Sequence, residues 1–346
     1  MTKHVLVVYN GEAKSQIKTK AWIGQIVEEL NKHDQYIISL FPTAKETQVR
    51  EIVELIEPPL DFLIAAGGDG TIRLALAALA QARSDVPAAI FPLGTGNVFA
   101  RNIGVISGGL LSNGLDNAYE YLVDSVPMRI DLGMMNGEYF CCFAGVGPVS
   151  DAFMKPARID KTRFKLFAYI KALLASIGRP PRLFKITVDG VSKIVQASAV
   201  FFVEVEDLGL NKDNDLNVLS DGYLNMHIIN PLTCSDYIAL FKRYAHGEND
   251  YAPEFLSRIK EARVEALPRP GLRSDFQKLV GKLYKLLTGH EPHDIERVRE
   301  LPCMIDGDAW GKTPMHVKVI PQAVNVLVPR SKMNHSQEEI KLDIAS

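Results

Sequence analysis

A glycine-rich turn with one aspartate is the stretch of this sequence best suited to chemistry. It spans Gly67–Thr71 and follows the apolar run Phe62–Ala66. Such a run is typical of a strand buried in a parallel sheet, and the apolar residues after the turn are typical of a helix packed on it. Glycine lets backbone N–H groups approach an anion closely, and a helix N-terminus adds favourable partial charge. The stretch by itself fits either a phosphate site or a purely structural turn.

A second glycine-threonine turn favours the phosphate interpretation. Pro92–Asn97 follows the next strand-like run, Ala88–Phe91. Because the carboxyl ends of parallel strands meet at one edge of a sheet, we expect both turns to face one crevice. No G-x-G-x-x-G follows the first strand and no Gly-Lys-Ser/Thr is found, so neither a Rossmann fingerprint nor a Walker loop explains the pattern.

Two late aspartates are separate candidates for acid–base chemistry. Asp306 and Asp308 are separated by one glycine. A strand would place both side chains on one face, whereas a tight turn would splay them. Two close carboxylates raise each other's proton affinity, which suits one of them to accept a proton. The other interpretation is a hairpin turn with two solvated carboxylates.

The first third of the chain repeats a strand-then-helix pattern. Its strand-like runs are His4–Tyr9, Tyr36–Phe41, Phe62–Ala66 and Ala88–Phe91. Amphipathic segments with helical spacing separate them, which is typical of a parallel sheet with crossover helices. We therefore expect an α/β N-terminal domain with a parallel sheet over residues 1–124.

After about residue 125 the pattern changes to strands and tight turns. Four dipeptides are two-residue turn signals: Asn136–Gly137, Asp189–Gly190, Asp221–Gly222 and Asp306–Gly307. Strand-like runs such as Ile194–Val205 lie beside them. We expect a β-rich, antiparallel sandwich-like domain over residues 125–330 with helical insertions. The strand-like run Val324–Val328 could return to either domain, and residues 331–346 form a frayed tail.

The composition narrows the class of protein. The 346 residues are 47% hydrophobic and 23% charged with a net charge of -2, which fits a folded globular protein and argues against one that coats nucleic acid. No apolar run is long enough for a bilayer and the start of the chain leads directly into a strand, so we expect a cytoplasmic protein. The four cysteines, at positions 141, 142, 234 and 303, lack the density of a disulfide framework or the spacing of a metal site. They predict buried thiols.

Two amphipathic segments rich in basic residues interrupt the β half. They are Phe164–Ile177 and Ser274–Leu287, and the second lies in what looks like an insertion over residues 268–300. Each fits an ordinary surface helix or a basic patch that rests on an anionic membrane.

Taken together, the two glycine turns resemble the diacylglycerol kinase catalytic family, which includes bacterial diacylglycerol kinases and sphingosine and ceramide kinases. Phe143–Ala152, Ser220–Leu224 and Ile305–Asp308 resemble later motifs of that family in the same order. The resemblance implies an α/β domain that binds ATP and a β-rich domain that completes a lipid site across a cleft. It implies ATP- and Mg²⁺-dependent transfer of the γ-phosphate to the hydroxyl of a diacylglycerol, sphingoid or ceramide-type lipid. It also implies transient, peripheral contact with a membrane.

The resemblance assigns roles to individual residues. Those that would line the nucleotide site are Asn10, Thr43, Gly67, Gly68, Asp69, Gly70, Thr71, Gly94, Thr95 and Asn97. Asp69 matches the loop aspartate needed for activity, Asp306 matches the proposed general base, and Asp308 stands at the family's glutamate. Asp221 would be linked to magnesium, helped by backbone carbonyls near Val218 and Tyr223.

The sequence departs from the family pattern in two loops. Asn10–Lys14 stands where the family has Asn-Pro-x-Ser-Gly, and Glu204–Gly209 replaces a glycine-rich turn that borders the acceptor. The identity of the lipid therefore stays open, as does the choice between a monomer and a homodimer. Two alternative functions are an NAD kinase, which shares the Gly-Gly-Asp-Gly-Thr motif, and a catalytically silent nucleotide-binding membrane sensor.

Overall fold

The structure is a computed structural model that describes most of the two halves of the chain. The described residues are 2–11, 23–24, 27–28, 30, 36–58, 60–94, 96–105, 124–147, 181–205, 215–231, 235–236, 239, 254–268 and 300–333. Thr95, both basic amphipathic segments, residues 269–299 of the insertion and the tail from 334 lie outside them. Within the described residues, no helix has the length and apolarity needed to cross a membrane.

A ten-stranded sheet begins with the predicted parallel strands. These are β1 (Lys3–Asn10), β2 (Tyr36–Thr43), β3 (Leu60–Gly67) and β4 (Ala88–Pro92), and they run parallel in the order β2-β1-β3-β4. Because β1 lies between β2 and β3, the strand order reverses beside β1. Open α/β sheets bind ligands at the carboxyl ends of the strands that flank such a reversal.

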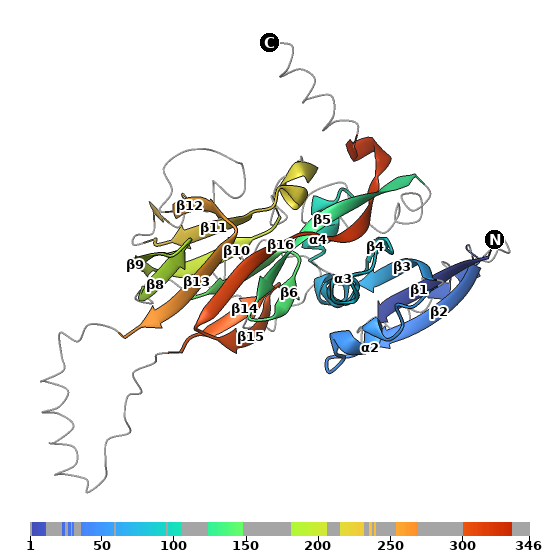
Figure 1. The fold of residues 1–346 in the computed structure, drawn as a ribbon, viewed down its shortest axis with the longest axis horizontal. Helices are drawn as coiled ribbons and strands as arrows, with labels where there is room; N and C mark the ends of the chain where they lie inside the picture. Colours follow the sequence, from blue (N-terminus) through green and yellow to red (C-terminus); the bar gives the residue numbers. More distant parts are fainter. Residues whose placement is uncertain are drawn as a thin grey trace, which may run out of the picture.

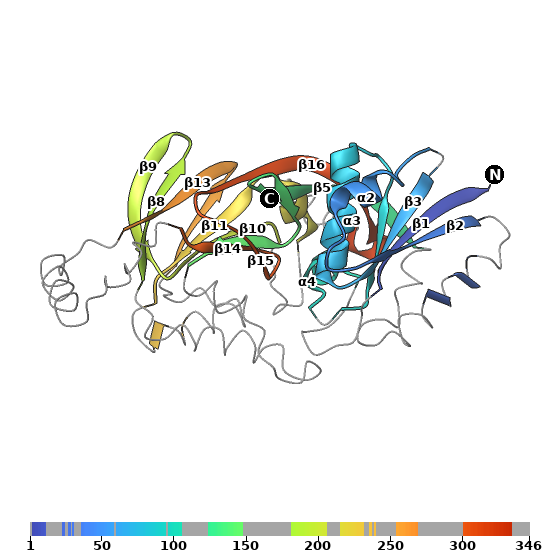
Figure 2. The same ribbon diagram turned by 90° about the horizontal axis from the view of Figure 1, so that it is seen from below.

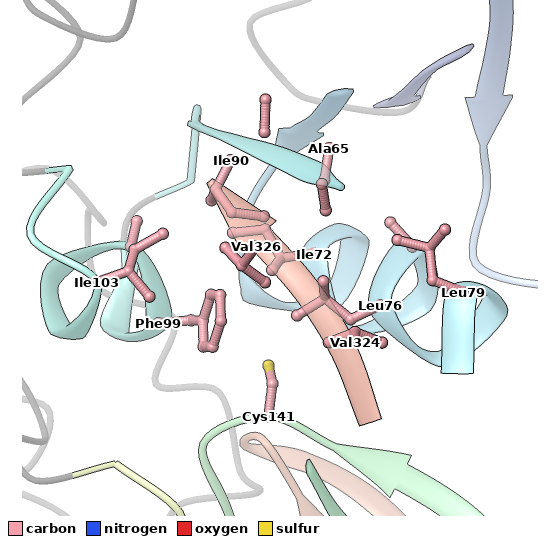
Figure 3. Packing of buried hydrophobic residues seen from close by; sticks show 14 of the residues in the cluster. Ala65, Ile72, Leu76, Leu79, Ile90, Phe99, Ile103, Cys141, Val324 and Val326 are labelled. Atoms are coloured by element: carbon pink, nitrogen blue, oxygen red, sulfur yellow. The ribbon is translucent and has the colours of Figure 1, made fainter. Parts of the chain in front are cut away.

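The helices that accompany these strands include α2 (Val49–Val53), α3 (Asp69–Ala82) and α4 (Val98–Asn102). α3 is buried along most of its length because its apolar side chains recur at helical spacing and small alanines fill the positions between them. Figure 3 shows Ile72 and Leu76 of α3 facing Val324 and Val326, with Phe99 of α4 beside them. This packing fixes the N-terminus of α3 at the carboxyl end of β3.

Within the described part of the second half there are twelve strands and one 3-10 helix. They are β5 (Ser125–Met135), β6 (Glu138–Phe140), β7 (Phe143–Val146), β8 (Arg182–Val188), β9 (Val191–Ala197), β10 (Ala199–Val203), η1 (Leu216–Ser220), β11 (Leu224–Ile229), β12 (Glu254–Ile259), β13 (Glu261–Leu267), β14 (Pro302–Ile305), β15 (Asp308–Lys312) and β16 (Met315–Pro329). A six-stranded antiparallel sheet has the order β12-β11-β10-β7-β14-β15. Its inner face packs on β8 and β13 of the first sheet through a second apolar cluster that includes Phe184, Phe202 and Ile305. The predicted fold class, a parallel α/β half followed by an antiparallel β-rich half, is confirmed.

The long strand β16 joins the two halves. It pairs in parallel with β4 at Val326 and Ala88, and antiparallel with both β5 and β13. In Figure 1 it runs from the β-rich half across to the strands of the first half, and Figure 2 shows the same course from below. The first sheet is therefore continuous past residue 124, and the domain limits at 124 and 330 stay a prediction.

Three of the four predicted turn dipeptides are tight hairpin turns. Asn136, Asp189 and Asp306 all have φ near +49°, and each is followed by a glycine with positive φ. The prediction for Asp221–Gly222 was wrong: this pair follows η1, and Asp221 has a φ of -88°. The Gly222 N–H there donates to the Asp131 carboxylate at 2.6 Å, so a side chain on β5 holds the turn. The run Ile194–Val205 also divides into β9 and β10, which lie in different sheets.

Leu76→Ala should lower the free energy of unfolding by about 2–5 kcal/mol, because the Leu76 side chain is fully buried in the core beneath α3. The matched variant Leu55→Ala removes a leucine that is 43% exposed and should cost less than about 1 kcal/mol. Denaturant unfolding of both variants checks the pair. Equal losses would contradict the packing described for α3.

Candidate active site

The two glycine turns touch each other. The Leu93 N–H donates to the Gly67 carbonyl at 2.9 Å, which joins the turn after β4 to the end of β3. A Cβ added to Gly94 would lie 2.4 Å from the Cα of Gly68, which is closer than real Cβ contacts. The two backbones can therefore meet only because position 94 carries no side chain. Thr71 closes the other side of the first turn, since a Cβ on Gly67 would lie 2.5 Å from its Oγ1.

Asp69 ties the two turns to two helices. It is the first residue of α3, and its Oδ1 accepts a hydrogen bond from the Phe99 N–H at the start of α4, at 3.3 Å. A side chain at Gly96 would collide with its Oδ2. Burial raises the pKa of Asp69 to about 6; the Phe99 N–H opposes this shift and the nearby Asp306 charge adds to it.

The remaining nucleotide-site candidates lie at neighbouring strand ends. Asn97 adopts a left-handed conformation and donates its Nδ2 to the Gly94 carbonyl at 2.9 Å. Its buried Oδ1 has no hydrogen-bond partner among the described residues. Asn10 and Thr43 face each other in the β1–β2 register, and the Thr43 hydroxyl donates to the Tyr9 carbonyl at 3.1 Å. Thr95 lies outside the described residues.

Asp306 is held by the backbone of the β6–β7 connection. Its Oδ1 accepts hydrogen bonds from the N–H groups of Cys142 and Phe143, both at 2.9 Å, and its Oδ2 accepts one from Cys141 at 3.0 Å. Burial raises the pKa of Asp306, while these three hydrogen bonds and the Arg73 charge lower it. The carboxylate is therefore a fixed, partly buried group at the tip of the β14–β15 hairpin.

Asp308 has very different surroundings. It is exposed, and a side chain at Gly70 would place its Cβ 3.8 Å from Asp308 Oδ2. The β14–β15 hairpin thus carries an accessible carboxylate to the N-terminus of α3. Trp310, two residues along β15, lies 5.7 Å from the buried Arg73 guanidinium of α3, a cation–π contact that holds the two elements together.

The magnesium set implied by the resemblance belongs to another cluster. The Oδ2 of Asp221 binds Arg258 at 2.6 Å, and its Oδ1 accepts the Tyr223 N–H at 2.8 Å. The Arg258 guanidinium also lies 4.5 Å from the Tyr223 ring. Because this carboxylate already has a cationic partner, the set Val218, Asp221 and Tyr223 does not fit a metal ion in this conformation.

Sequence reasoning missed three buried charged residues. Asp131 accepts two backbone N–H groups, from Gly222 and Gln322. Glu204 is 1% exposed and neither of its carboxylate oxygens has a partner among the described residues; burial, with Asp131 and Asp221 nearby, raises its pKa well above the usual value. Arg73 lies inside an apolar helix. A charged residue within an apolar run was the available signal in each case.

Comparisons with known proteins agree with this geometry. Residues 4–135 match the diacylglycerol kinase catalytic domain. The matched segment contains both glycine turns and ends at β5. A diacylglycerol kinase from Bacillus subtilis (strain 168) is 27% identical over 265 residues, which cover 71% of this chain and 80% of that protein. One from Staphylococcus epidermidis is 20% identical over 339 residues, covering 96% of this chain and 95% of that protein.

Solved structures share the fold of this chain. A crystal structure of a diacylglycerol kinase from Bacillus anthracis str. Sterne has a TM-score of 0.63 at 19% identity, and the match covers 95% of this chain and 98% of that chain. Another structure from the same organism has a TM-score of 0.69 at 20% identity, covering 95% of this chain and 96% of that chain. Both halves and their arrangement are therefore common to these proteins.

Gly94→Ala should lower the affinity for ATP by at least about tenfold, because its Cβ would meet the Gly68 backbone at 2.4 Å and push the turns apart. Gly24→Ala is a matched control, since nothing lies within 4 Å of an added Cβ there. Isothermal titration calorimetry with ATP measures both. Wild-type affinity in the Gly94 variant would contradict a phosphate site built on the contact between the turns.

Asp69→Asn should gain stability relative to the wild type as the pH rises from about 4 to about 7, measured without nucleotide. Asp69 has a folded-state pKa of about 6, above its ordinary 3.8. Between these values the folded protein keeps a proton that the unfolded chain releases, so the wild type loses stability as the pH rises. Denaturant unfolding across this range gives the difference. A difference that does not change with pH would contradict the buried, proton-retaining Asp69.

Proposed function

We propose that the chain is an ATP-dependent lipid kinase that transfers the γ-phosphate of ATP to the hydroxyl of a lipid. The observation that carries this proposal is the meeting of two halves: the Asp308 carboxylate of the β14–β15 hairpin faces Gly70 at the N-terminus of α3. Phosphoryl transfer needs these parts, backbone donors for the donor phosphates and a carboxylate that accepts the acceptor's proton. The names of the relatives support a lipid such as diacylglycerol as the acceptor.

The donor side of the proposed site is the pair of glycine turns. Backbone N–H groups at Gly68, Gly70 and Gly94 bind the phosphates, helped by the partial positive charge at the start of the 14-residue helix α3. Asn10, Thr43, Gly67, Thr71, Thr95 and Asn97 complete the set that we assign to the nucleotide. Asp69 offers the carboxylate oxygens that Mg²⁺ prefers. Bound with ATP, that ion would neutralise charge on the phosphates.

The two hairpin aspartates take different roles in this proposal. Three backbone N–H groups donate to the Asp306 carboxylate, so most of its lone pairs are engaged and the group is held in place. Asp308 is exposed and free to meet a substrate. We therefore assign proton acceptance to Asp308, and to Asp306 the positioning of the hairpin, in place of the base role expected from the sequence. Asp306 and Asp69 keep the site anionic until a cation or proton enters.

The names of the relatives support a lipid as the acceptor of the phosphate. A lipid hydroxyl lies at a membrane surface, so we propose peripheral and transient membrane contact. The acceptor's identity among diacylglycerol, sphingoid and ceramide-type lipids is settled by measurement: purified protein, ATP, Mg²⁺ and a panel of lipids in mixed micelles, with products identified by mass spectrometry. Conversion of NAD to NADP without any lipid product would instead make the chain an NAD kinase, and tight ATP binding with no transfer to any acceptor would make it a silent sensor.

Asp308→Asn should lower kcat by about 10²–10⁴-fold while leaving ATP affinity unchanged and the free energy of unfolding within about 0.5 kcal/mol, since the residue is exposed. Asp306→Asn should lower both kcat and stability, the latter by about 1–3 kcal/mol, because an amide NH₂ would face a backbone donor. Asp189→Asn changes an equivalent Asp–Gly hairpin turn between β8 and β9 and should keep full activity.

The same three variants can contradict the assignment. Full turnover by Asp308→Asn would remove Asp308 from the base role. Loss of turnover in Asp306→Asn with unchanged stability would return that role to Asp306.

A further inference from the structure

Two adjacent cysteines lie beside Asp306, and the proposed kinase chemistry does not use their thiols. Cys141 and Cys142 form the bend between β6 and β7. Successive side chains of a regular strand point to opposite faces, but the bend brings both sulphurs together, with Sγ atoms 3.9 Å apart. Each residue is 1% exposed. In Figure 3 the Cys141 sulphur points from this bend toward Phe99 of α4.

A carboxylate oxygen completes a set of three potential metal ligands. Asp306 Oδ2 lies 3.5 Å from the Cys141 Sγ, and the ligand atoms of Cys141, Cys142 and Asp306 all lie within 4.8 Å of one another. The three backbone N–H groups that bind Asp306 come from this same bend. The two thiols belong to this bend, and the carboxylate is hydrogen-bonded to its backbone. The arrangement of the three groups is therefore set before any cation binds.

The spacing fits a tetrahedral zinc site. Two thiolates bound at about 2.3 Å to tetrahedral Zn²⁺ lie about 3.8 Å apart, and a thiolate and a carboxylate oxygen bound at about 2.0 Å lie about 3.5 Å apart. The observed separations are 3.9 Å for Sγ to Sγ and 3.5 Å for Sγ to Oδ2. Asp306 is only partly buried, so a cation can approach from its side and keep a water as fourth ligand.

The local charge also favours a cation. Asp69 and Asp306 are close enough that the charge of Asp306 helps to raise the pKa of Asp69. Burial, together with both carboxylates, raises the pKa of the Cys142 thiol well above its usual value. Arg73 is the cationic side chain that acts on Asp306. Thiolates select Zn²⁺ and related soft cations, whereas Mg²⁺ prefers oxygen ligands. The set therefore discriminates against the magnesium that accompanies ATP.

We propose that Cys141, Cys142 and Asp306 form a binding site for one thiophilic divalent cation of the Zn²⁺ class. Binding replaces the two thiol protons, which are released to solvent, by two metal–sulphur bonds. The bound cation also competes with the backbone N–H groups for the Asp306 carboxylate and so displaces the hairpin that carries Asp308. Inhibition of phosphoryl transfer follows from this. That consequence rests on the proposed function, but cation binding does not.

The test uses the reduced, metal-free full chain titrated with Co²⁺, whose thiolate complexes absorb in the near ultraviolet. We expect a sulphur-to-cobalt band that saturates at one equivalent and is abolished by one equivalent of Zn²⁺. Zinc-edge X-ray absorption of the wild-type zinc complex should show two sulphur neighbours at about 2.3 Å. No band, or a zinc ion with fewer than two sulphur neighbours, overturns the proposal without need of a variant.

Cysteine variants locate the site. The band should be lost in Cys141→Ser and in Cys142→Ser, each checked for folding by circular dichroism. It should persist in Cys303→Ala, whose buried thiol is hydrogen-bonded to the Leu301 carbonyl at 3.8 Å, and in Cys234→Ser. A band that survives both of the first two substitutions, or that disappears in Cys234→Ser, overturns the assignment.

Activity is a separate measurement. Zn²⁺ at saturating concentration should suppress lipid phosphorylation by the wild type at least about tenfold, with excess Mg²⁺ present, and should leave the Cys142→Ser rate close to its own zinc-free value. A chain that binds Co²⁺ as described but phosphorylates no lipid would contradict the proposed function and leave the cation site standing. Protein that phosphorylates lipid but shows no cobalt band would contradict the cation site and leave the proposed function standing.

Discussion

The contact between the backbones of Gly68 and Gly94 is the constraint on which the rest of the site depends. A Cβ on Gly94 would lie 2.4 Å from the Gly68 Cα, so the turns after β3 and β4 can meet only if position 94 has no side chain. Their contact puts the start of α3 against the start of α4, where the Asp69 carboxylate accepts the Phe99 N–H. One close approach of two loops thus aligns two helix N-termini and one buried acid at the strand-order reversal of the sheet.

The acidic residues of the site differ in burial and in hydrogen bonding. Burial raises the pKa of both Asp69 and Asp306, because each carboxyl group is largely removed from water. Three backbone donors stabilise Asp306 in place, whereas Asp308 stays exposed at the same hairpin. One carboxylate held by hydrogen bonds beside an accessible one fits our proposal of a positioning group and a reacting group better than two equivalent bases. The adjacent thiols add soft ligands to this anionic centre.

The fold was predictable where local pattern decides it. The apolar runs at Val5–Val8 and Leu63–Ala66 became the parallel strands β1 and β3, because a strand buried on both faces must be apolar throughout. Hairpin turns at Asn136, Asp189 and Asp306 followed from the tolerance of Asn and Asp for positive φ before a glycine. The prediction of a hairpin turn at Asp221 was wrong because the Gly222 N–H binds a remote side chain, Asp131. No local sequence pattern indicates that contact.

The candidate site was predictable in its residues more than in its contacts. Spacing and resemblance selected both glycine turns and both hairpin aspartates, and the structure brings Gly70 and Asp308 together. The resemblance gave the base role to Asp306 and could not foresee its hydrogen bonds, because the backbone donors lie more than 160 residues away in sequence. Cys141, Cys142 and Arg73 were likewise invisible as site residues, since only the tertiary fold places them beside Asp306.

The most direct measurement is a crystal structure of the protein with Mg²⁺ and a non-hydrolysable ATP analogue. The β- and γ-phosphates should lie on the backbone N–H groups of Gly68, Gly70 and Gly94, with the γ-phosphate between the start of α3 and the Asp308 carboxylate. A nucleotide bound elsewhere, or one whose γ-phosphate points away from the β14–β15 hairpin, would contradict a phosphoryl-transfer site built on the contact of the two glycine turns.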